Sequence, residues 1–319
     1  MTPASPRPVF VIGSFVMACC WFTSRLPGRG EHVHADGFLM EPGGKGLNVA
    51  VGLQRLGARV HLLLAHGDDV SADALLQVLV REALPTAHVH RLPGPSGHGV
   101  GIIDEHGEHV IVVHPGANHR LSATHVAAAA ADIAASALVY AQFEAPEHVI
   151  LAAFQAARLA GVPTVLNPSP WRPVCPLLLA EVDTLLLNEH EAAALLGVSP
   201  GCDVSADAWL ASARAWRHAH PGTALLVTQG EAGCLWWPSD ASEPQRHPAR
   251  GVHAVDTTGC GDAFAAAWCD AQARALSAAQ ALPWANLAGA WVAARPGVMG
   301  ALPSRAALQA WAAAEPAAP

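Results

Sequence analysis

Short apolar runs divide the first third of the chain into strands and one helix. Residues 9–15 form a continuous apolar run, which is typical of a strand buried on both faces, and residues 60–65 form another. Between them, residues 47–56 carry apolar side chains at helical spacing and stop at Gly57, which predicts a helix ended by glycine. Residues 30–42 are polar and without a clear period.

Two further strand-like segments do not continue this pattern. Residues 99–104 and 109–114 flank the polar stretch 105–108, which predicts a β-hairpin. We expect them to belong to a small sheet that stands off the main domain as a lid. This lid would be built from about residues 14–42 and 97–115.

From residue 122 onward, helices and strands alternate. The expected helices are 122–135, 146–160, 189–196, 205–219, 260–274 and 283–295. The expected strands are 137–142, 162–167, 182–187 and 223–228, with shorter pieces at 232–237 and 244–248. Such alternation favours an α/β fold with a mainly parallel sheet covered by helices on both faces. No repeat or low-complexity linker interrupts it, so we expect a single domain over residues 1–319.

Composition and charge exclude several classes of function. Hydrophobic residues make up 52% and charged residues 14% of the 319, enough for a large core. The formal net charge of −8, without a Lys/Arg stripe, argues against nucleic acid as a partner. No apolar run reaches the roughly 18 residues that a bilayer requires, so we expect no membrane partner and a cytoplasmic location. The seven cysteines lack C-x-x-C spacing, which disfavours disulfides and structural zinc.

The strongest candidate for chemistry is the turn Asp256-Thr257-Thr258-Gly259-Cys260-Gly261-Asp262, which opens the helix expected at 260–274. Glycines let the backbone approach a phosphate, and the free N–H groups and dipole of a helix N-terminus favour negative charge. Asp262 in the first turn would stay ionised and accept a proton from an alcohol. A capped turn with two structural aspartates is the alternative.

A second glycine-rich segment, Pro42-Gly43-Gly44-Lys45-Gly46-Leu47-Asn48, also precedes a helix. It contains Lys45, the only lysine among the 18 basic residues. It is no Walker A loop, because Gly46 stands where Ser or Thr is required. Alone, it is better explained as an ordinary flexible entry turn.

Together the two segments resemble the paired signatures of the ribokinase-like sugar kinases, the PfkB family. The resemblance extends over roughly residues 8–306, and weaker matches follow in order at Asn188–Glu191, Val227–Gly230 and Ala294–Gly297. It implies a ribokinase-like three-layer α/β/α fold with a small β-sheet lid. It also implies an ATP-dependent phosphotransferase acting on a hydroxyl of a small sugar.

The resemblance assigns roles to individual residues. Asp262 would be the catalytic base, and the backbone of Gly259, Cys260 and Gly261 would form an anion hole. Substrate hydroxyls would be bound by Gly44, Lys45, Asn48 and Glu144, although Lys45 is given no chemistry of its own. The nucleotide pocket would be lined by Asn188, Thr228, Gly230 and Asn286.

The same resemblance implies two cations. Mg²⁺ would be organised through water by Glu191 together with Asn188, three residues apart on one helix face. Without the resemblance, this pair reads as an ordinary helix start. Asp256 and Thr258 would help to hold a monovalent cation such as K⁺.

One departure concerns the substrate. The ribokinase pattern has Asn at the position of Val16 and Asp at that of Ala18, and these side chains grip sugar hydroxyls. Losing a hydroxyl-binding carboxylate removes a strong discriminator, so ribose is in doubt as the acceptor. The residues that follow, Cys19 to Phe22, make an apolar wall.

Three hypotheses therefore stand. The first is a sugar kinase. The second is a nucleoside kinase of the same fold, which the apolar wall favours. The third is a non-catalytic nucleotide- or sugar-binding regulator, against which the intact Asp262, Asn188 and Glu191 argue. Unpaired edges of the lid sheet favour a homodimer.

Overall fold

The protein was analysed as a computed structural model that describes residues 6–106, 108–198 and 206–314. Three features expected from the sequence fall outside these ranges: Gly107 in the hairpin turn, Cys202, and the start of a helix at residue 205.

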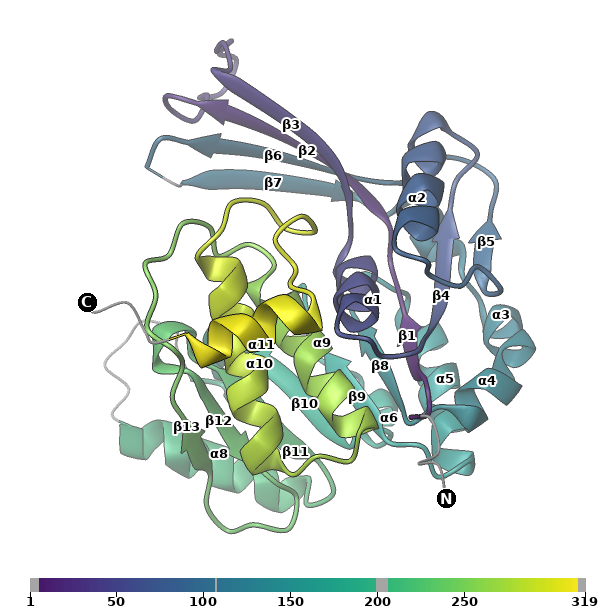
Figure 1. Ribbon diagram of the computed structural model, residues 1–319, viewed down its shortest axis with the longest axis vertical. Coiled ribbons are helices and arrows are strands. Elements are labelled where there is room, and N and C mark those ends of the chain that lie inside the picture. The colour runs from purple at the N-terminus through teal and green to yellow at the C-terminus, as the bar shows by residue number, and fades with distance from the viewer. Residues whose placement is uncertain (1–5, 107, 199–205, 315–319) are drawn as a thin grey trace.

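Within the described residues, nine strands form the main sheet of a ribokinase-like α/β fold (Figure 1). In spatial order they are β13 (Gln245–His247), β12 (Cys234–Trp237), β11 (Ala224–Thr228), β10 (Thr184–Asn188), β9 (Thr164–Asn167), β8 (Leu138–Gln142), β1 (Val9–Ile12), β4 (Val60–His66) and β5 (Val89–Arg91). All pairings are parallel except those of β12 with β11 and with β13.

Helices cover both faces of this sheet, and its strands are therefore buried on both sides. One layer holds α1 (Lys45–Arg55), α2 (Val70–Arg81), α9 (Cys260–Ala273), α10 (Ala278–Ala293) and α11 (Arg305–Ala313). The other holds α3 (Ala123–Ala128), α4 (Ala130–Ala135), α5 (Glu147–Leu159), α6 (Pro176–Leu179), α7 (Glu189–Leu196) and α8 (Ala206–Ala219). Along β1, Val9 and Val11 pack on the first layer, and Phe10 and Ile12 on the second. None of the described helices is both long and apolar enough to cross a membrane.

The chain order places a ligand crevice beside β1. From β1 the chain proceeds outward to β4 and β5 on one side, and then returns to β8, β9 and β10 on the other. In open α/β sheets, ligands bind at such a switch point, beyond the carboxyl ends of the strands. The ends of β1 and β8 therefore mark the expected site.

A second sheet projects from one end of the main domain (Figure 1). In the described residues it has four strands in the order β3 (Gly37–Gly43), β2 (Val16–Thr23), β6 (Gly97–Asp104) and β7 (His109–His114). β2 pairs antiparallel with β3 and parallel with β6, and β6 and β7 form the expected antiparallel pair. The lid sheet implied by the sequence is thus present.

Some boundaries differ from the sequence expectations. The strand expected at 9–15 ends at Ile12, because the chain leaves the main sheet at Gly13 and enters the lid as β2. β3 occupies the second half of the stretch that had no clear period. α2 has no counterpart among the expected elements. Its apolar pattern is blurred by Val70 and Val80, whose side chains are 86% and 81% exposed.

The helix expected at 283–295 begins at Ala278 instead. Ser277 and Gln280 form a capping box at its start, and Pro283 lies inside the helix. Proline favours the first turn of a helix, so its position suggested a start that is five residues late.

Candidate functional site

The candidate residues gather at the carboxyl ends of the parallel strands. Ser14 follows β1, Glu144 follows β8, and Asn188 and Thr228 end β10 and β11, where they are register partners. The N-termini of α1 and α9 lie at the same end of the sheet, since each begins after a chain segment that returns there. Side chains far apart in sequence are thereby brought to one edge.

The two glycine-rich segments meet in a hydrogen bond. Nδ2 of Asn48 in α1 donates to Oδ2 of Asp262 in the first turn of α9, at 2.8 Å. Both residues are buried, at 5% and 7% exposure. Oδ1 of Asn48 is buried and has no partner among the described residues. An acceptor that is buried without a partner costs free energy unless a ligand donates to it.

The surroundings of Asp262 shift its pKa in opposite directions. Burial raises the pKa of the Asp262 carboxyl above its ordinary value, while the Lys45 ammonium and the Asn48 hydrogen bond lower it and Glu144 raises it. The net pKa is raised. A carboxylate that is buried yet held near a cation is suited to take a proton from a hydroxyl. Lys45, to which the sequence assigned no chemistry, therefore favours the ionised form of the candidate base Asp262.

Glu144 is fixed at the opposite side of the site by neighbours that the sequence did not single out. Its Oε2 accepts from Ser14 Oγ at 2.6 Å and from the Lys45 backbone N–H at 2.8 Å. Gln142 donates through Nε2 to Ser14 Oγ at 3.2 Å and accepts from the Glu144 backbone N–H at 2.5 Å. Ser14 and Gln142 thus position Glu144. Their signal was a polar residue at the end of a buried strand.

Glycine at position 44 is required by the backbone that carries Lys45. Gly44 has φ of 114°, a conformation that L-residues rarely adopt. A Cβ there would lie 2.4 Å from the Ser14 carbonyl oxygen. The close approach holds the N-terminus of α1 against the end of β1.

The N-terminus of α9 offers unused backbone donors. Gly259 is its N-cap, with φ of 80°. No described acceptor takes the N–H groups of Gly259, Gly261 and Asp262, whereas the N–H of Cys260, which was also expected in the anion hole, donates to the Thr257 carbonyl at 3.3 Å. A Cβ added to Gly261 would meet nothing within 4 Å, so space is open beside these donors. Burial, with Asp256 and Asp262, raises the pKa of the Cys260 thiol to about 11, so this thiol is protonated near neutral pH. The arrangement fits an anion.

Asp256 ties two loops together at this edge. Its Oδ1 accepts from the Thr258 backbone N–H at 2.9 Å, and its Oδ2 accepts from that of Gly297 at 3.2 Å. The segment after α10 is therefore held to the segment before α9. Thr258 takes part through its backbone.

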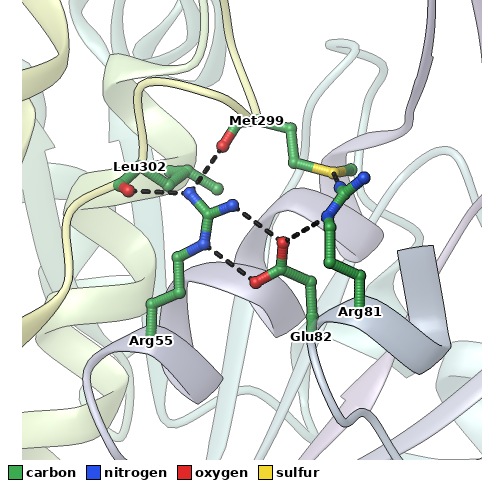
Figure 2. A network of polar contacts seen from close by, with 5 residues as sticks. All are labelled: Arg55, Arg81, Glu82, Met299 and Leu302. Atoms are coloured by element: carbon green, nitrogen blue, oxygen red, sulfur yellow. Dashed lines mark hydrogen bonds and ion pairs between the residues drawn. The ribbon is translucent and has the colours of Figure 1, made fainter.

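A partly buried ionic network supports the same C-terminal loop (Figure 2). Arg55 at the end of α1 forms two hydrogen bonds with Glu82, at 2.8 and 2.9 Å. Its Nη1 donates to the carbonyl oxygens of Met299 and Leu302, both at 2.8 Å. Arg81 joins Glu82 at 3.1 Å from the exposed side. One guanidinium thus fastens α1, the end of α2 and the loop that follows Gly297.

Asn188 and Glu191, the residues proposed to organise Mg²⁺, form the start of helix α7, as the alternative interpretation of this pair predicted. Asn188 is the N-cap of α7: its Oδ1 accepts from the Glu191 N–H, and Glu191 Oε2 accepts from the Asn188 N–H. This is a capping box. It occupies one oxygen of Glu191, whose Oε1 has no partner among the described residues. Capping and a water-mediated Mg²⁺ contact are therefore compatible.

The other nucleotide candidates make mainly structural contacts. Asn286 in α10 is buried, and its Nδ2 donates to the carbonyls of His247 and Pro248 at 2.9 and 3.2 Å. Thr228 Oγ1 donates to the Leu187 carbonyl at 3.3 Å. Gly230 has φ of 52°, and nothing lies within 4 Å of an added Cβ.

Tyr140 on β8 lies among the carboxylates. Burial raises the pKa of its phenol well above the ordinary value, and the charges of Asp262, Glu191 and Glu144 raise it further. Its hydroxyl has no partner among the described residues. This fully buried phenol thus feels the charge of all three carboxylates.

Strand alternation divides the apolar wall between two faces of the lid. Ala18, Cys20 and Phe22 share one face of β2, and Cys19 and Trp21 lie on the other. The face that carries Cys20 is the one nearer the site. Burial and nearby carboxylates, Asp256 among them, raise the pKa of the Cys20 thiol. The wall expected from the sequence was therefore only half right, because two of its four residues point away.

Comparison with known proteins agrees with this geometry. Residues 7–305 match the model of the pfkB family carbohydrate kinases. The chain is 31% identical to the ribokinase of Bacillus subtilis (strain 168) over 299 residues, which cover 94% of this chain and 97% of that protein. It is also 31% identical to the deoxyribokinase of Salmonella typhi over 259 residues, 80% of this chain and 82% of that one.

A solved structure shows the same fold. The ribokinase of Arabidopsis thaliana, complexed with ribose and ATP, superposes with a TM-score of 0.86 at 24% identity and covers 98% of this chain and 100% of that one. Both glycine-rich segments lie inside the range that matches the family. The chain therefore belongs to the pfkB family of carbohydrate kinases and is an ATP-dependent phosphotransferase.

Proposed function

We propose that this kinase phosphorylates a hydroxyl of a small sugar, and that Asp262 is the base. The observation that carries the proposal is the buried Asn48–Asp262 hydrogen bond at the open N-terminus of α9. It sets a carboxylate beside free backbone donors, so a hydroxyl at Asp262 lies next to a place for phosphoryl oxygens.

The step balances in protons and electrons. The acceptor hydroxyl gives its proton to a carboxylate oxygen of Asp262, and its oxygen forms a bond to the γ-phosphorus of ATP. The bond from that phosphorus to the bridging oxygen breaks, and ADP leaves with the electron pair. The N–H groups of Gly261 and Asp262 take up charge that spreads over the transferring oxygens.

Glu191 and Asn188 would hold Mg²⁺ through water, since Glu191 keeps one carboxylate oxygen outside its capping box. When bound, Mg²⁺ neutralises phosphate charge. Asp256 and Thr258 would contribute to a monovalent cation site, for which K⁺ is the candidate. The Asp256 carboxylate already bridges the two loops that such a cation would touch.

A sugar suits the substrate side of the site better than a nucleoside. Asn48 Oδ1 awaits a donor, and Glu144 Oε1 has no partner among the described residues. The apolar wall that favoured a nucleoside supplies only Cys20 and Phe22 to the face of Ala18. The hydroxyl groups of a sugar satisfy these acceptors, and a sugar has no base that would need an apolar wall to cover it.

We also propose a homodimer formed through the lid. Large apolar side chains are exposed on the face of the lid sheet away from Ala18, among them Phe38, Met40 and Val112. β3 and β7 are the edge strands of this sheet in the described structure. A second copy presents the same apolar surface and the same edges, so the contact is self-complementary.

The test is ATP consumption with Mg²⁺ and K⁺ across pentoses, hexoses, ketoses, deoxy sugars and nucleosides. Wild type and Asp262→Asn are assayed in parallel. We expect turnover on a sugar, reduced in the variant by about 10² or more. Turnover confined to nucleosides would select the second hypothesis. Silence on all acceptors would favour a binding protein that has kept the fold, and equal activity in the variant would remove Asp262 as the base.

A further inference from the structure

We propose that Glu41 on β3 replaces the sugar-gripping carboxylate that is missing at Ala18, and that the acceptor presents it with a pair of neighbouring hydroxyls. This inference rests on the proposed sugar kinase function. It identifies a specificity-determining residue, and it narrows the acceptor to a polyhydroxylated sugar.

The register of the lid sheet places the two positions side by side. Ala18 on β2 is the direct antiparallel partner of Glu41 on β3. Directly opposed residues point to the same face of a sheet, with their Cβ atoms about 5 Å apart. The carboxylate that is absent at Ala18 on β2 is therefore supplied by Glu41 on the neighbouring strand, on the same face of the sheet.

That face is turned toward the catalytic edge. Glu41 is half-buried, whereas Met40, next to it on the opposite face of β3, is 58% exposed. Burial raises the pKa of the Glu41 carboxyl, and the charge of Asp256, in the segment before α9, raises it further. Cys20, on the same face, also feels both Glu41 and Asp256. Glu41 thus faces the loop that leads into the anion cradle.

The carboxylate of Glu41 is unused in the described part of the chain. Its pKa reflects burial and Asp256 alone, without a hydrogen bond or a cation. A half-buried carboxylate beside another carboxylate is costly to keep without donors. Two hydroxyls of a sugar supply such donors, since a carboxylate accepts on both oxygens.

The displacement by one strand also bears on which sugar is bound. Glutamate is one methylene longer than the aspartate of the ribokinase pattern, and it enters from the β3 edge of the lid. A sugar held in this way has its hydroxyl pair shifted toward β3 relative to ribose. Val16 and Ala18 then present no polar group at the two positions where that pattern has polar side chains.

The test uses the full-length enzyme with its best acceptor from the panel, and with the monodeoxy analogues of that acceptor. Glu41→Gln keeps the size of the side chain and removes its charge. We expect KM for the acceptor to rise about 10- to 100-fold, with kcat changed much less, because hydrogen bonds to charged groups discriminate at this level. The matched control is Asp36→Asn, which removes the charge of an exposed carboxylate directly before β3 and should leave KM unchanged.

Deoxy analogues separate recognition from a merely structural role. One analogue should bind wild type as weakly as Glu41→Gln binds the full sugar, and combining the two losses should add little. Ala18→Asp combined with Glu41→Ala should shift kcat/KM toward D-ribose. Wild-type turnover that Glu41→Gln leaves unchanged overturns this inference alone. A wild type without turnover on any acceptor overturns the proposed function, and this inference with it.

Discussion

Nδ2 of Asn48 donates to Oδ2 of Asp262 at 2.8 Å, although 214 residues separate the two in the chain. The bond joins the glycine-rich starts of α1 and α9, which pack closely enough that a Cβ at Gly52 would lie 2.8 Å from that of Ala266. The amide nitrogen lowers the pKa of Asp262, which favours its ionised form, and Oδ1 has no partner among the described residues, so under the proposed function it can accept from the substrate.

Replacing Asn48 by Ala should therefore damage both binding and proton transfer. The variant loses the hydrogen bond that lowers the pKa of Asp262, so that pKa rises and the acid limb of the activity profile moves to higher pH. We expect kcat/KM to fall about 10- to 100-fold at neutral pH. Gln54→Ala, at the other end of the same helix, is the control. Unchanged kinetics in Asn48→Ala would contradict the role assigned to the amide.

The single lysine of the chain should show itself in the pH profile. Removing the Lys45 charge in Lys45→Met disfavours the ionised form of Asp262 and so raises its pKa. Since the base acts only when ionised, the acid limb of kcat should move to higher pH. Lys45→Arg keeps the charge and should leave the limb nearly in place. The comparison is made on kcat, measured from about pH 5 to 9, and equal limbs in both variants would rule out an electrostatic role.

The fold was largely predictable because its signals are local. The parallel strands are continuous apolar runs, and glycine-rich turns mark the two helix starts that carry Asn48 and Asp262. The lid was harder to predict in detail, because β3 shows no alternation of buried and exposed residues and none of its residues is fully buried. α2 was not predicted, because its exposed valines obscure the helical period of its apolar residues.

The site was predictable only as far as motifs extend. Sequence motifs placed Asp262, but no single-sequence signal showed that Ser14 and Gln142 hold Glu144, since those contacts span about 130 residues. The same limit applies to Glu41. Its pairing with Ala18 depends on strand register, which follows only once both strands are known.

The Arg55–Glu82 pair should support stability above the ordinary carboxyl pKa. The Arg55 hydrogen bonds lower the pKa of Glu82 from its ordinary value of 4.5. Because the folded-state pKa is lowered, the ionised carboxylate stabilises the fold. This stability is complete above the unfolded-state pKa and is lost as pH falls through the folded-state pKa. We expect Glu82→Gln to reduce the free energy of unfolding by about 1–3 kcal/mol at pH 7, and the difference from wild type to shrink in acid.

Urea unfolding at pH 7 and at pH 3 to 4 measures this difference. Arg81→Ala is the control, because the Arg81 side chain is 61% exposed and its pair with Glu82 contributes about 0–1 kcal/mol. A Glu82→Gln deficit that is the same at both pH values would show that packing, and not charge, holds the loop at Met299 and Leu302.

The proposed lid dimer can be broken by one charge. Val112 is 65% exposed and lies beside Val100, which pairs with Cys19 on the face of the lid away from Ala18. A carboxylate at this position would be buried without a partner in the dimer but solvated in the monomer. Val112→Asp should therefore raise the dissociation constant of the dimer by about 100-fold or more. Sedimentation velocity over a concentration series measures this dissociation constant.

Val80→Asp on α2 is the control, because the valine is 81% exposed there, and it should leave the dimer intact. A wild type that sediments as a monomer throughout would exclude the dimer, and a Val112→Asp variant as tightly associated as wild type would place the contact elsewhere.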